Sequence, residues 1–332
     1  MRPAWIAAIA LSCATVTLTP CQATEPDRQQ IWPDDWPDAW FEPARTASQL
    51  GITSFSQSPM LDDRDLPPVV DRLPRDPVVV VPLKELGLYG GTARITSDEW
   101  LTFPNVESPL TISADMRTFL PNLAEWWSVS PDGRKITLRL RAGIKWSDGT
   151  PFTSEDFMFV FNDLWLNKEM SPVTDPNIIG GRAVKIDDLT FFYQFQNSNP
   201  LFVNRLAQYG NFLVAPKNYY REFHPGYVNR EALNARIRDM GFISWMAFIG
   251  ACRRGLIDQS VDAPTLDAHR IVSTTPLLRR YERNPYYFKV DPAGQQLPYI
   301  DGIESKVVEN KEVITAMASA GQLDFSSYEL RT

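Results

Sequence analysis

Apolar and polar residues alternate along positions 135–141. The apolar set is Ile136, Leu138 and Leu140. A period of two puts alternate side chains on opposite faces of an extended chain, so this stretch predicts a β-strand with one buried and one solvated face. An Asp-Gly turn signal at 132–133 precedes the strand, and Ser-Asp-Gly at 147–149 turns the chain after it.

A helical period replaces the alternation after Pro151. Thr153 is a suitable N-cap and Asp156 suits the first helical turn, so we expect a helix from 155 to about 168. Its apolar stripe contains Phe157, Val160, Phe161 and Leu164. Other apolar side chains, Met158, Phe159 and Leu166, lie largely on the opposite side. A helix that is apolar on two sides is usually buried on both, which indicates an architectural rather than a catalytic role.

Shorter patterns predict further elements. A Gly-Gly turn at 90–91 leads into a strand at 92–96, and 184–186 with 191–195 predict a hairpin. Residues 211–216 read as a buried strand that ends at a proline, and 277–283 as another strand. We expect 122–127 to be a short helical or irregular segment.

The last part of the chain predicts a βαβ unit. A strand at 305–309 precedes a helix that Asn310 caps and Gly321 ends, and 322–326 is a second strand. The two strands of such a unit are parallel and need covering layers on both faces. Either earlier strands complete this sheet or residues are missing from the chain.

Composition narrows the class of partner. The chain has 332 residues, 44% of them hydrophobic and 22% charged, which fits one large or two ordinary globular domains. Its formal net charge is −7. Nucleic acids and anionic membranes bind basic surfaces, so neither is expected as the partner.

The first 23 residues resemble a secretory signal. Arg2 supplies the positive start, an apolar run extends from Ala4 to about Leu18, and small residues flank a cleavage site at 21–23. This predicts an extracytoplasmic, periplasmic or secreted protein. An uncleaved anchor is the alternative. A lipoprotein attached at Cys21 is disfavoured, because Pro20 stands where a small residue is expected.

Residues 24–87 form a proline- and tryptophan-rich arm. Trp32, Trp36 and Trp40 are four residues apart, but the prolines at 33 and 37 oppose a regular helix. We expect an extended arm whose tryptophans dock on the domain surface. The alternative is an aromatic platform for a sugar or a partner.

Catalytic and metal-binding signatures are absent from the sequence. Removal of the signal leaves one cysteine, Cys252, which predicts a buried small hydrophobe and no disulfide. The two histidines, His224 and His269, read as surface or loop residues, and no His-Glu-x-x-His or Gly-x-Ser-x-Gly pattern occurs. Carboxylate pairs lie in turns. We therefore expect no cofactor, no metal and no enzyme activity, with a secreted hydrolase as the alternative class.

A long stretch then resembles a known family. Residues 121–161 read PNLAEWWSVSPDGRKITLRLRAGIKWSDGTPFTSEDFMFVF. Their order of Pro-x-Leu-Ala-x-x-Trp, Asp-Gly turn, alternating strand and Lys-Trp-Ser-Asp-Gly-x-Pro-Phe-Thr-x-Glu-Asp is similar to the family 5 solute-binding proteins of ABC importers. GGTARI at 90–95, FLVAPKNYY at 212–220, ERNPYYF at 282–288 and GQLDF at 321–325 also resemble that family. The usual Gly-Pro-Tyr turn before Arg-Asn-Pro is not recognisable.

The resemblance implies an α/β, periplasmic-binding-protein-like type II fold with two lobes and a subdomain inserted into lobe one. Mapped on this chain, 88–107 and 180–302 would form lobe one, 108–179 the inserted subdomain, and 303–332 the start of lobe two. Family members usually run to 500 residues or more. We therefore expect that most of the second lobe is missing from these 332 residues.

The resemblance also implies a function. It predicts the extracytoplasmic binding component of an ABC importer, a monomer that encloses a peptide between its lobes and delivers it to a membrane permease. An oligosaccharide ligand is the alternative, motivated by ten tryptophans, because sugars stack on aromatic faces. By resemblance the segment after the first strand lines the cleft. The predicted ligand-binding residues are Thr96, Ser97, Asp98, Trp100 and Phe159, each with ordinary packing or loop capping as the alternative.

Overall fold

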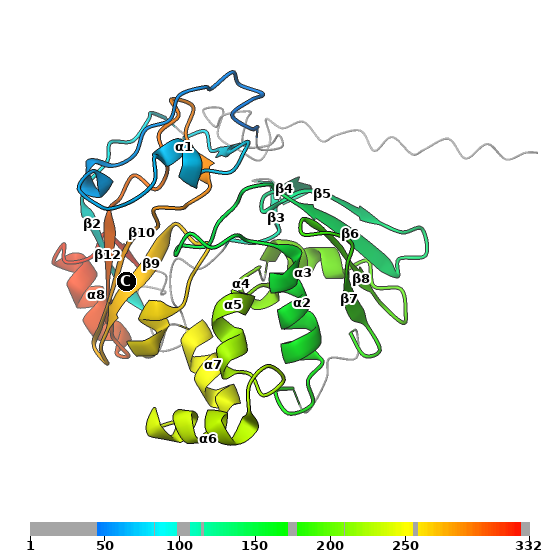
Figure 1. Cartoon of the computed structure of the whole chain (residues 1–332). Coiled ribbons are helices and arrows are strands. Elements are labelled where there is room, and N and C mark those ends of the chain that lie inside the picture. The colour runs from blue at the N-terminus through cyan, green and yellow to red at the C-terminus, as the bar shows by residue number, and fades with distance from the viewer. Residues whose placement is uncertain are drawn as a thin grey trace, which may run out of the picture. The chain divides into compact units, whose positions relative to one another are not determined.

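A computed structural model describes residues 45–82, 84–97, 107–113, 116–171, 178–208, 210–254 and 258–326 (Figure 1). The helices are α1 (Val69–Arg72), α2 (Ser154–Met158), α3 (Phe202–Gln208), α4 (Gly210–Leu213), α5 (Lys217–Tyr220), α6 (Arg230–Asp239), α7 (Trp245–Arg253) and α8 (Lys311–Ser319). Short 3₁₀ segments are η3 (Pro59–Leu61), η5 (Arg221–Phe223) and η6 (Asp258–Asp262), and η4 (Phe159–Trp165) is a π-helix.

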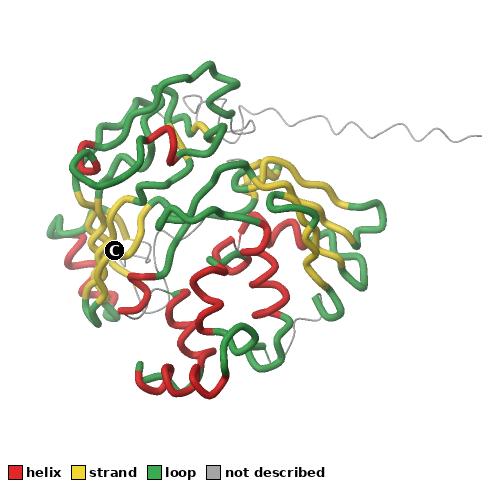
Figure 2. The backbone as a smooth tube through the Cα atoms, viewed as in Figure 1, coloured by secondary structure: helices red, strands yellow, loops and turns green. Residues whose placement is uncertain are grey.

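The strands fall into four sheets. They are β1 (Val78–Val79), β2 (Thr92–Ser97), β3 (Leu110–Ile112), β4 (Phe119–Pro121), β5 (Ala124–Val129), β6 (Lys135–Leu140), β7 (Arg182–Lys185), β8 (Thr190–Gln194), β9 (His269–Thr274), β10 (Leu278–Arg283), β11 (Lys289–Val290), β12 (Gly302–Val307) and β13 (Phe325–Ser326). The two larger sheets have the orders β13-β2-β12-β10-β9 and β5-β6-β8-β7. Figure 2 shows both as yellow strands, with the helices in red.

The five-stranded sheet contains the predicted βαβ unit. Strand β12 is followed by α8 and then by β13, and both strands pair in parallel with β2, which lies between them. The Asn310 side chain caps α8 by accepting from the Glu312 amide at 2.8 Å. Earlier strands therefore complete this sheet. Strands β12 and β13, from the region predicted to begin lobe two at 303–332, extend the same sheet as β2 and β10. The division into lobes stays a prediction.

The four-stranded sheet is antiparallel throughout. The predicted strand β6 pairs with β5 on one side and β8 on the other, and β7 with β8 forms the predicted hairpin. The prediction of a helical or irregular segment at 122–127 is wrong, because Ala124–Val129 pairs with β6 across the Asp132-Gly133 turn. Two strands of this sheet, β5 and β6, precede residue 179 and the other two, β7 and β8, follow residue 180. A boundary between 179 and 180, as predicted between the inserted subdomain and lobe one, would divide the sheet.

The unit from Lys145 to Trp165 follows the sequence prediction closely. Gly149 has φ +84°, a conformation that favours glycine, and the Trp146 amide donates to the Thr150 carbonyl across the turn at 2.8 Å. Thr153 and Asp156 form a reciprocal capping box at the start of α2. The helix continues directly into η4, so its total length is near that predicted.

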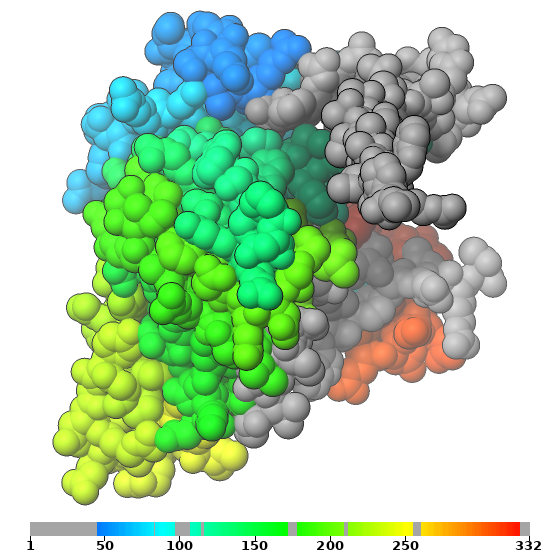
Figure 3. Space-filling view, turned by 90° about the vertical axis from the view of Figure 1, so that its right-hand side faces the viewer, coloured from blue at the N-terminus to red at the C-terminus, as the bar shows by residue number. Residues whose placement is uncertain are grey.

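This helix separates two apolar cores. Phe157 and Phe161 pack in a core with β6 and β8, and the residues Phe159, Val160 and Leu164 pack in a second core with α5, α6 and α7. Burial on both sides is thereby confirmed. In the space-filling view, atoms of the green-coloured residues between about 110 and 200 pack into one continuous surface beside those of α6 (Figure 3).

Part of the predicted arm packs on the body. Strand β1 pairs in parallel with β11, and Leu73 and Val79 pack against Val290. Arg72 is fully buried, and its guanidinium donates to the Pro67 carbonyl at 2.9 Å and to the Pro285 carbonyl. Residues from 45 onward therefore belong to the folded body. Trp32, Trp36 and Trp40, like the predicted signal at 1–23, lie outside the described residues.

One predicted strand is a helix. Residues 210–213 form α4, and the chain then extends to Pro216, where α5 begins. A short apolar run does not distinguish a buried strand from a buried helix, because both conceal every side chain. The buried strand predicted at 211–216 is therefore wrong.

Candidate functional site

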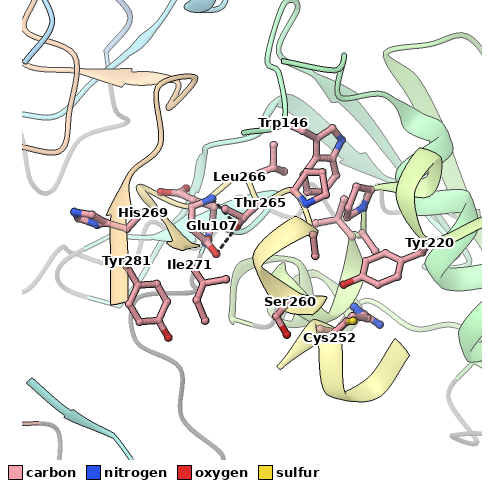
Figure 4. Close-up of a pocket in the computed structure, with 17 residues that line it drawn as sticks. Glu107, Trp146, Tyr220, Cys252, Ser260, Thr265, Leu266, His269, Ile271 and Tyr281 are labelled. Atoms are coloured by element: carbon pink, nitrogen blue, oxygen red, sulfur yellow. Dashed lines mark hydrogen bonds between the residues drawn. The ribbon is translucent and has the colours of Figure 1, made fainter. Parts of the chain in front are cut away.

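A cavity of about 100 Å³ opens between the five-stranded sheet and the helices that follow Pro216. On the sheet side it is lined by His269, Ile271 and Tyr281. Tyr220, Cys252 and Ser260 line it on the helical side, and Glu107 and Trp146 also reach it (Figure 4). The space exceeds what one water molecule needs, and it is smaller than the roughly 300–1,000 Å³ of a whole drug-sized ligand site.

Charged groups at the cavity are compensated by neighbouring donors. The Glu107 carboxylate accepts from the Lys289 ammonium at 2.8 Å, from the Tyr287 hydroxyl at 2.5 Å and from Asn122 Nδ2 at 2.8 Å. The Asp267 carboxylate accepts from the Glu107 amide at 3.2 Å and from the Thr265 hydroxyl at 2.8 Å. These carboxylates therefore serve the protein's own network. The remaining lining consists of aliphatic side chains, hydroxyls, aromatic rings and the guanidinium of Arg253.

The helical wall carries the buried thiol predicted from sequence. Cys252 is 4% exposed, and burial raises the pKa of its thiol to about 12. It is therefore a neutral, weakly polar group at neutral pH. The adjacent Arg253 guanidinium donates to the Phe212 carbonyl at 3.0 Å.

Cys252 should resist alkylation in the folded protein. In a Cys13→Ser/Cys21→Ser variant, Cys252 should react with iodoacetamide at pH 8 at least about 100-fold more slowly than in urea, because both burial and the raised pKa suppress the thiolate. Mass spectrometry of quenched samples gives the rate. Equal rates in the folded and unfolded protein would contradict the buried position.

Tyr281 is the unusual group on the sheet wall. Its side chain is 5% exposed, and within the described part of the chain its hydroxyl has no hydrogen-bond partner. Burial raises the pKa of this phenol to about 12, so the hydroxyl stays protonated at neutral pH. A buried hydroxyl without a partner is costly, which is why such groups are rare in folded proteins.

The sequence prediction placed both histidines at the surface or in loops. His224 does lie in the loop after η5, whereas His269 is the first residue of β9, and a surface position is wrong for both. His224 and His269 are buried, at 4% and 5% exposure. His269 Nε2 lies 2.9 Å from the Ile300 carbonyl, and burial lowers the pKa of the ring. His224 Nε2 lies 3.1 Å from the Asp163 carbonyl. Both rings are thus parts of the core rather than exposed titrating groups.

Thr96 and Phe159, the predicted ligand-binding residues whose side chains the structure describes, do not line the cavity. Thr96 is buried on β2, and its side chain faces away from Tyr281, because Ala93 and Ile95 share the Tyr281 face of the sheet. Ser97 is the last residue of β2. Asp98 and Trp100 lie outside the described residues. Glu107, the first described residue after them, lines the cavity.

Phe159 is a core residue in this structure. It is fully buried, and its ring lies 5.8 Å from that of His224 and 6.1 Å from that of Tyr227, measured between centroids. This is the packing alternative stated for it above. The side chain fills the second apolar core rather than the cavity.

Sequence reasoning missed Tyr281, the residue of β10 that lines the cavity. The strand itself was predicted, and its alternation contained a signal: Arg279, Tyr281 and Arg283 occupy one face, and Arg280 and Glu282 the other. Which face is buried depends on the elements that cover it. That information is not local to the strand.

Comparison with known proteins decides the family. The family model described as bacterial extracellular solute-binding proteins, family 5 middle, matches residues 118–330. The chain is a family 5 solute-binding protein. The family 5 assignment and the periplasmic-binding-protein fold, both expected from residues 121–161, are thereby confirmed.

Two solved structures and one curated protein are similar to this family 5 protein. A periplasmic alpha-galactoside-binding protein of Rhizobium meliloti is 31% identical over 80% of the chain and 40% of its own length. An oligopeptide-binding protein OppA has a TM-score of 0.76 and 32% identity over 84% of this chain and 46% of its own. The binding protein MelB of Agrobacterium fabrum, in complex with stachyose, has a TM-score of 0.65 and 27% identity over 82% of this chain and 44% of its own.

The chain therefore spans less than half the length of these relatives. All three are named as binding proteins. Among the described residues, no helix of this family 5 protein is long and apolar enough to cross a membrane, and no group of three or more histidine, cysteine, aspartate or glutamate side chains is arranged for a metal ion.

Proposed function

We propose that this family 5 protein is the extracytoplasmic binding component of an ABC importer and that its solute is an oligosaccharide of the alpha-galactoside type. The observation that carries the proposal is the 31% identity to an alpha-galactoside-binding protein over 80% of the chain. The similarity to a stachyose complex, found independently at the level of structure, supports the same class of solute.

The chemistry of the cavity also supports a neutral, hydroxylated solute. A peptide brings a charged amine and a charged carboxylate, and both need compensating charges where they are bound. Three charged side chains line the cavity, and each already has a partner in the protein: Glu107 accepts from Lys289 and Tyr287, Asp267 accepts from Thr265, and Arg253 donates to the Phe212 carbonyl. Aromatic rings with hydroxyl neighbours suit a sugar, whose ring faces are apolar and whose edge carries hydroxyls.

A peptide solute is the second candidate. The OppA structure, which is named as oligopeptide-binding, has a TM-score of 0.76 to this chain. With either solute, we also propose that the protein is a monomer, that it delivers the solute to a membrane permease, and that residues 1–23 are its secretory signal.

Binding of stachyose by the purified protein tests the proposal. Saturation-transfer NMR should give a saturable signal from stachyose with a Kd of about 1 mM, or roughly −4 kcal/mol. The expected free energy of binding is about half that of a micromolar site, because the chain aligns with less than half of the length of each of these relatives. Sorbitol is the control for non-specific contact with hydroxyls and should give no saturable signal.

Tetra-alanine in the same experiment separates the two candidates. A saturable signal from the peptide and none from stachyose would replace the sugar proposal with the peptide one. If neither ligand gives a saturable signal at concentrations well above the expected Kd, this protein does not bind either class by itself, and the proposal fails.

A further inference from the structure

The cavity beside β10 contains a hydrogen-bonding group that the protein itself does not use. Tyr281 lines the cavity, its side chain is 5% exposed, and its hydroxyl has no partner among the described residues. Folding places an unsatisfied polar group there although phenylalanine would fill the same space without the penalty. A ligand that supplies the missing hydrogen bond would remove that penalty.

The surroundings of Tyr281 indicate the size of the group that it meets. Its strand neighbours Ile271 and Ile303 pack around it in a small apolar cluster with Ile95. Across the cavity lie Ser260 and Cys252, on the helical side (Figure 4). The volume of about 100 Å³ admits more than one water molecule, but not a whole oligosaccharide.

The charge of the surroundings indicates the class of group. The Glu107 carboxylate is held by Lys289, and the Asp267 carboxylate by Thr265. The phenol and the Cys252 thiol are both neutral. The Arg253 guanidinium also lines the cavity and already donates to the Phe212 carbonyl. The Tyr281 hydroxyl is uncharged, and a sugar hydroxyl, which can both donate and accept, can supply the hydrogen bond that it lacks.

We propose that this cavity is a subsite for a single sugar ring and that the Tyr281 hydroxyl selects the ligand by hydrogen bonding to one of the ring hydroxyls. The inference rests on the proposed function and deepens it. Tyr281 is then a specificity residue, with Ile271 and the helical wall enclosing the ring. The hydrogen bond exists only in the complex, so its removal should weaken binding without weakening the fold.

The chain offers a matched control for this test. Tyr193 on β8 is also fully buried, and its hydroxyl also has no partner among the described residues, but it packs in the first apolar core with Phe161 and Phe202. Tyr281→Phe and Tyr193→Phe therefore remove the same atom from two similar environments, of which only one lines the cavity.

The experiment compares stachyose binding by the wild type and the two variants with saturation-transfer NMR, with thermal unfolding in parallel. Tyr281→Phe should raise the stachyose Kd about 5- to 10-fold, the effect of one hydrogen bond, and leave the unfolding midpoint unchanged or higher. Tyr193→Phe should change the Kd less than about 2-fold. A series of monodeoxy galactosides should contain one member that lacks the hydroxyl bound by Tyr281. This member should bind the wild type more weakly than the parent sugar does, and it should bind Tyr281→Phe as well as the parent sugar does.

Each result decides between the two proposals. If stachyose binds the wild type and Tyr281→Phe equally, or if Tyr193→Phe weakens binding as much, the subsite is wrong and the oligosaccharide function stands. If stachyose does not bind the wild type, the function fails and the subsite fails with it. A lowered unfolding midpoint in Tyr281→Phe would mean that the hydroxyl has a structural partner, which also overturns the subsite.

Discussion

Replacing Trp146 by alanine should lower the free energy of unfolding by about 3–5 kcal/mol, the usual cost of removing a large aromatic side chain from a core. Trp146 is 4% exposed and packs edge-on against Phe152, with 5.8 Å between ring centroids. Its indole nitrogen also donates to the buried Asp156 carboxylate at 3.2 Å. The substitution therefore leaves both a void and a buried acceptor with one donor fewer. Urea denaturation followed by circular dichroism measures the difference.

Trp126→Ala is the matched control. Trp126 lies on β5 and is 50% exposed, so its removal opens no enclosed void. We expect a change below about 1 kcal/mol, as for surface substitutions in general. If Trp146→Ala cost no more than Trp126→Ala, the turn at 146–150 would not be anchored by the tryptophan, and the packing described here would be incorrect.

Replacing Asp156 by alanine should cost about 3 kcal/mol, because one carboxylate serves three donors from separate parts of the chain. It accepts from the Trp146 indole at 3.2 Å, the Thr153 amide at 2.9 Å and the Lys217 amide at 2.9 Å. Each buried or half-buried donor that is left without an acceptor costs about 1–3 kcal/mol, and water can compensate part of that at the two half-buried amides.

The cost of Asp156→Ala should also depend on pH. Burial raises the pKa of Asp156 from 3.8 to about 6, although its three donors act in the opposite direction. The folded state then binds the proton more tightly than the unfolded state, so this carboxyl adds stability as the pH falls through 6 toward 4. The difference between wild type and Asp156→Ala should be about 1 kcal/mol larger at pH 5 than at pH 7.

Asp188→Asn is the control for this prediction. Asp188 pairs with Lys185 at 2.7 Å, but its side chain is 77% exposed. Its substitution should change stability by less than about 0.5 kcal/mol at either pH. A pH-independent cost for Asp156→Ala would mean that the carboxyl has its ordinary pKa, and a cost as small as that of Asp188→Asn would mean that its three donors find other partners.

Local signals predicted the elements whose causes are local. The capping box of Thr153 and Asp156, the Asn310 cap of α8 and the alternation of β6 each depend on residues within a few positions of one another. These elements form because the chain satisfies its own end groups or divides its two faces, whatever lies around it. The sequence therefore identified them with nearly correct bounds.

Elements whose causes are distant could not be predicted in this way. Strand β5 contains adjacent tryptophans and no alternation, and it is a strand because β6 returns beside it. The apolar run at 212–215, which begins inside α4, is too short to distinguish a helix from a strand. The placement of β2 between β12 and β13 depends on segments more than 200 residues away. None of these contacts is visible in a window of neighbouring residues.

The candidate site was predicted only in outline. Resemblance pointed to Thr96, Ser97, Asp98 and Trp100. Thr96 does not line the cavity, and Asp98 and Trp100 lie outside the described residues. The resemblance did not indicate Tyr281, because the sequence of β10 gives the alternation but not the side that other elements cover. It assigned a possible cleft role to Phe159, which the helices α5–α7 enclose instead.

The order of the strands in the five-stranded sheet has a consequence for biosynthesis. Strand β2 emerges early, but its neighbours in the sheet, β12 and β13, are made only when the chain reaches residues 302–326. The backbone amides and carbonyls of residues 92–97 can therefore pair only after a segment about 200 positions later has been synthesised. Pairing between segments so distant in the sequence is slow. A nascent polypeptide therefore keeps β2 without its two partner strands while all the residues between β2 and β12 are synthesised.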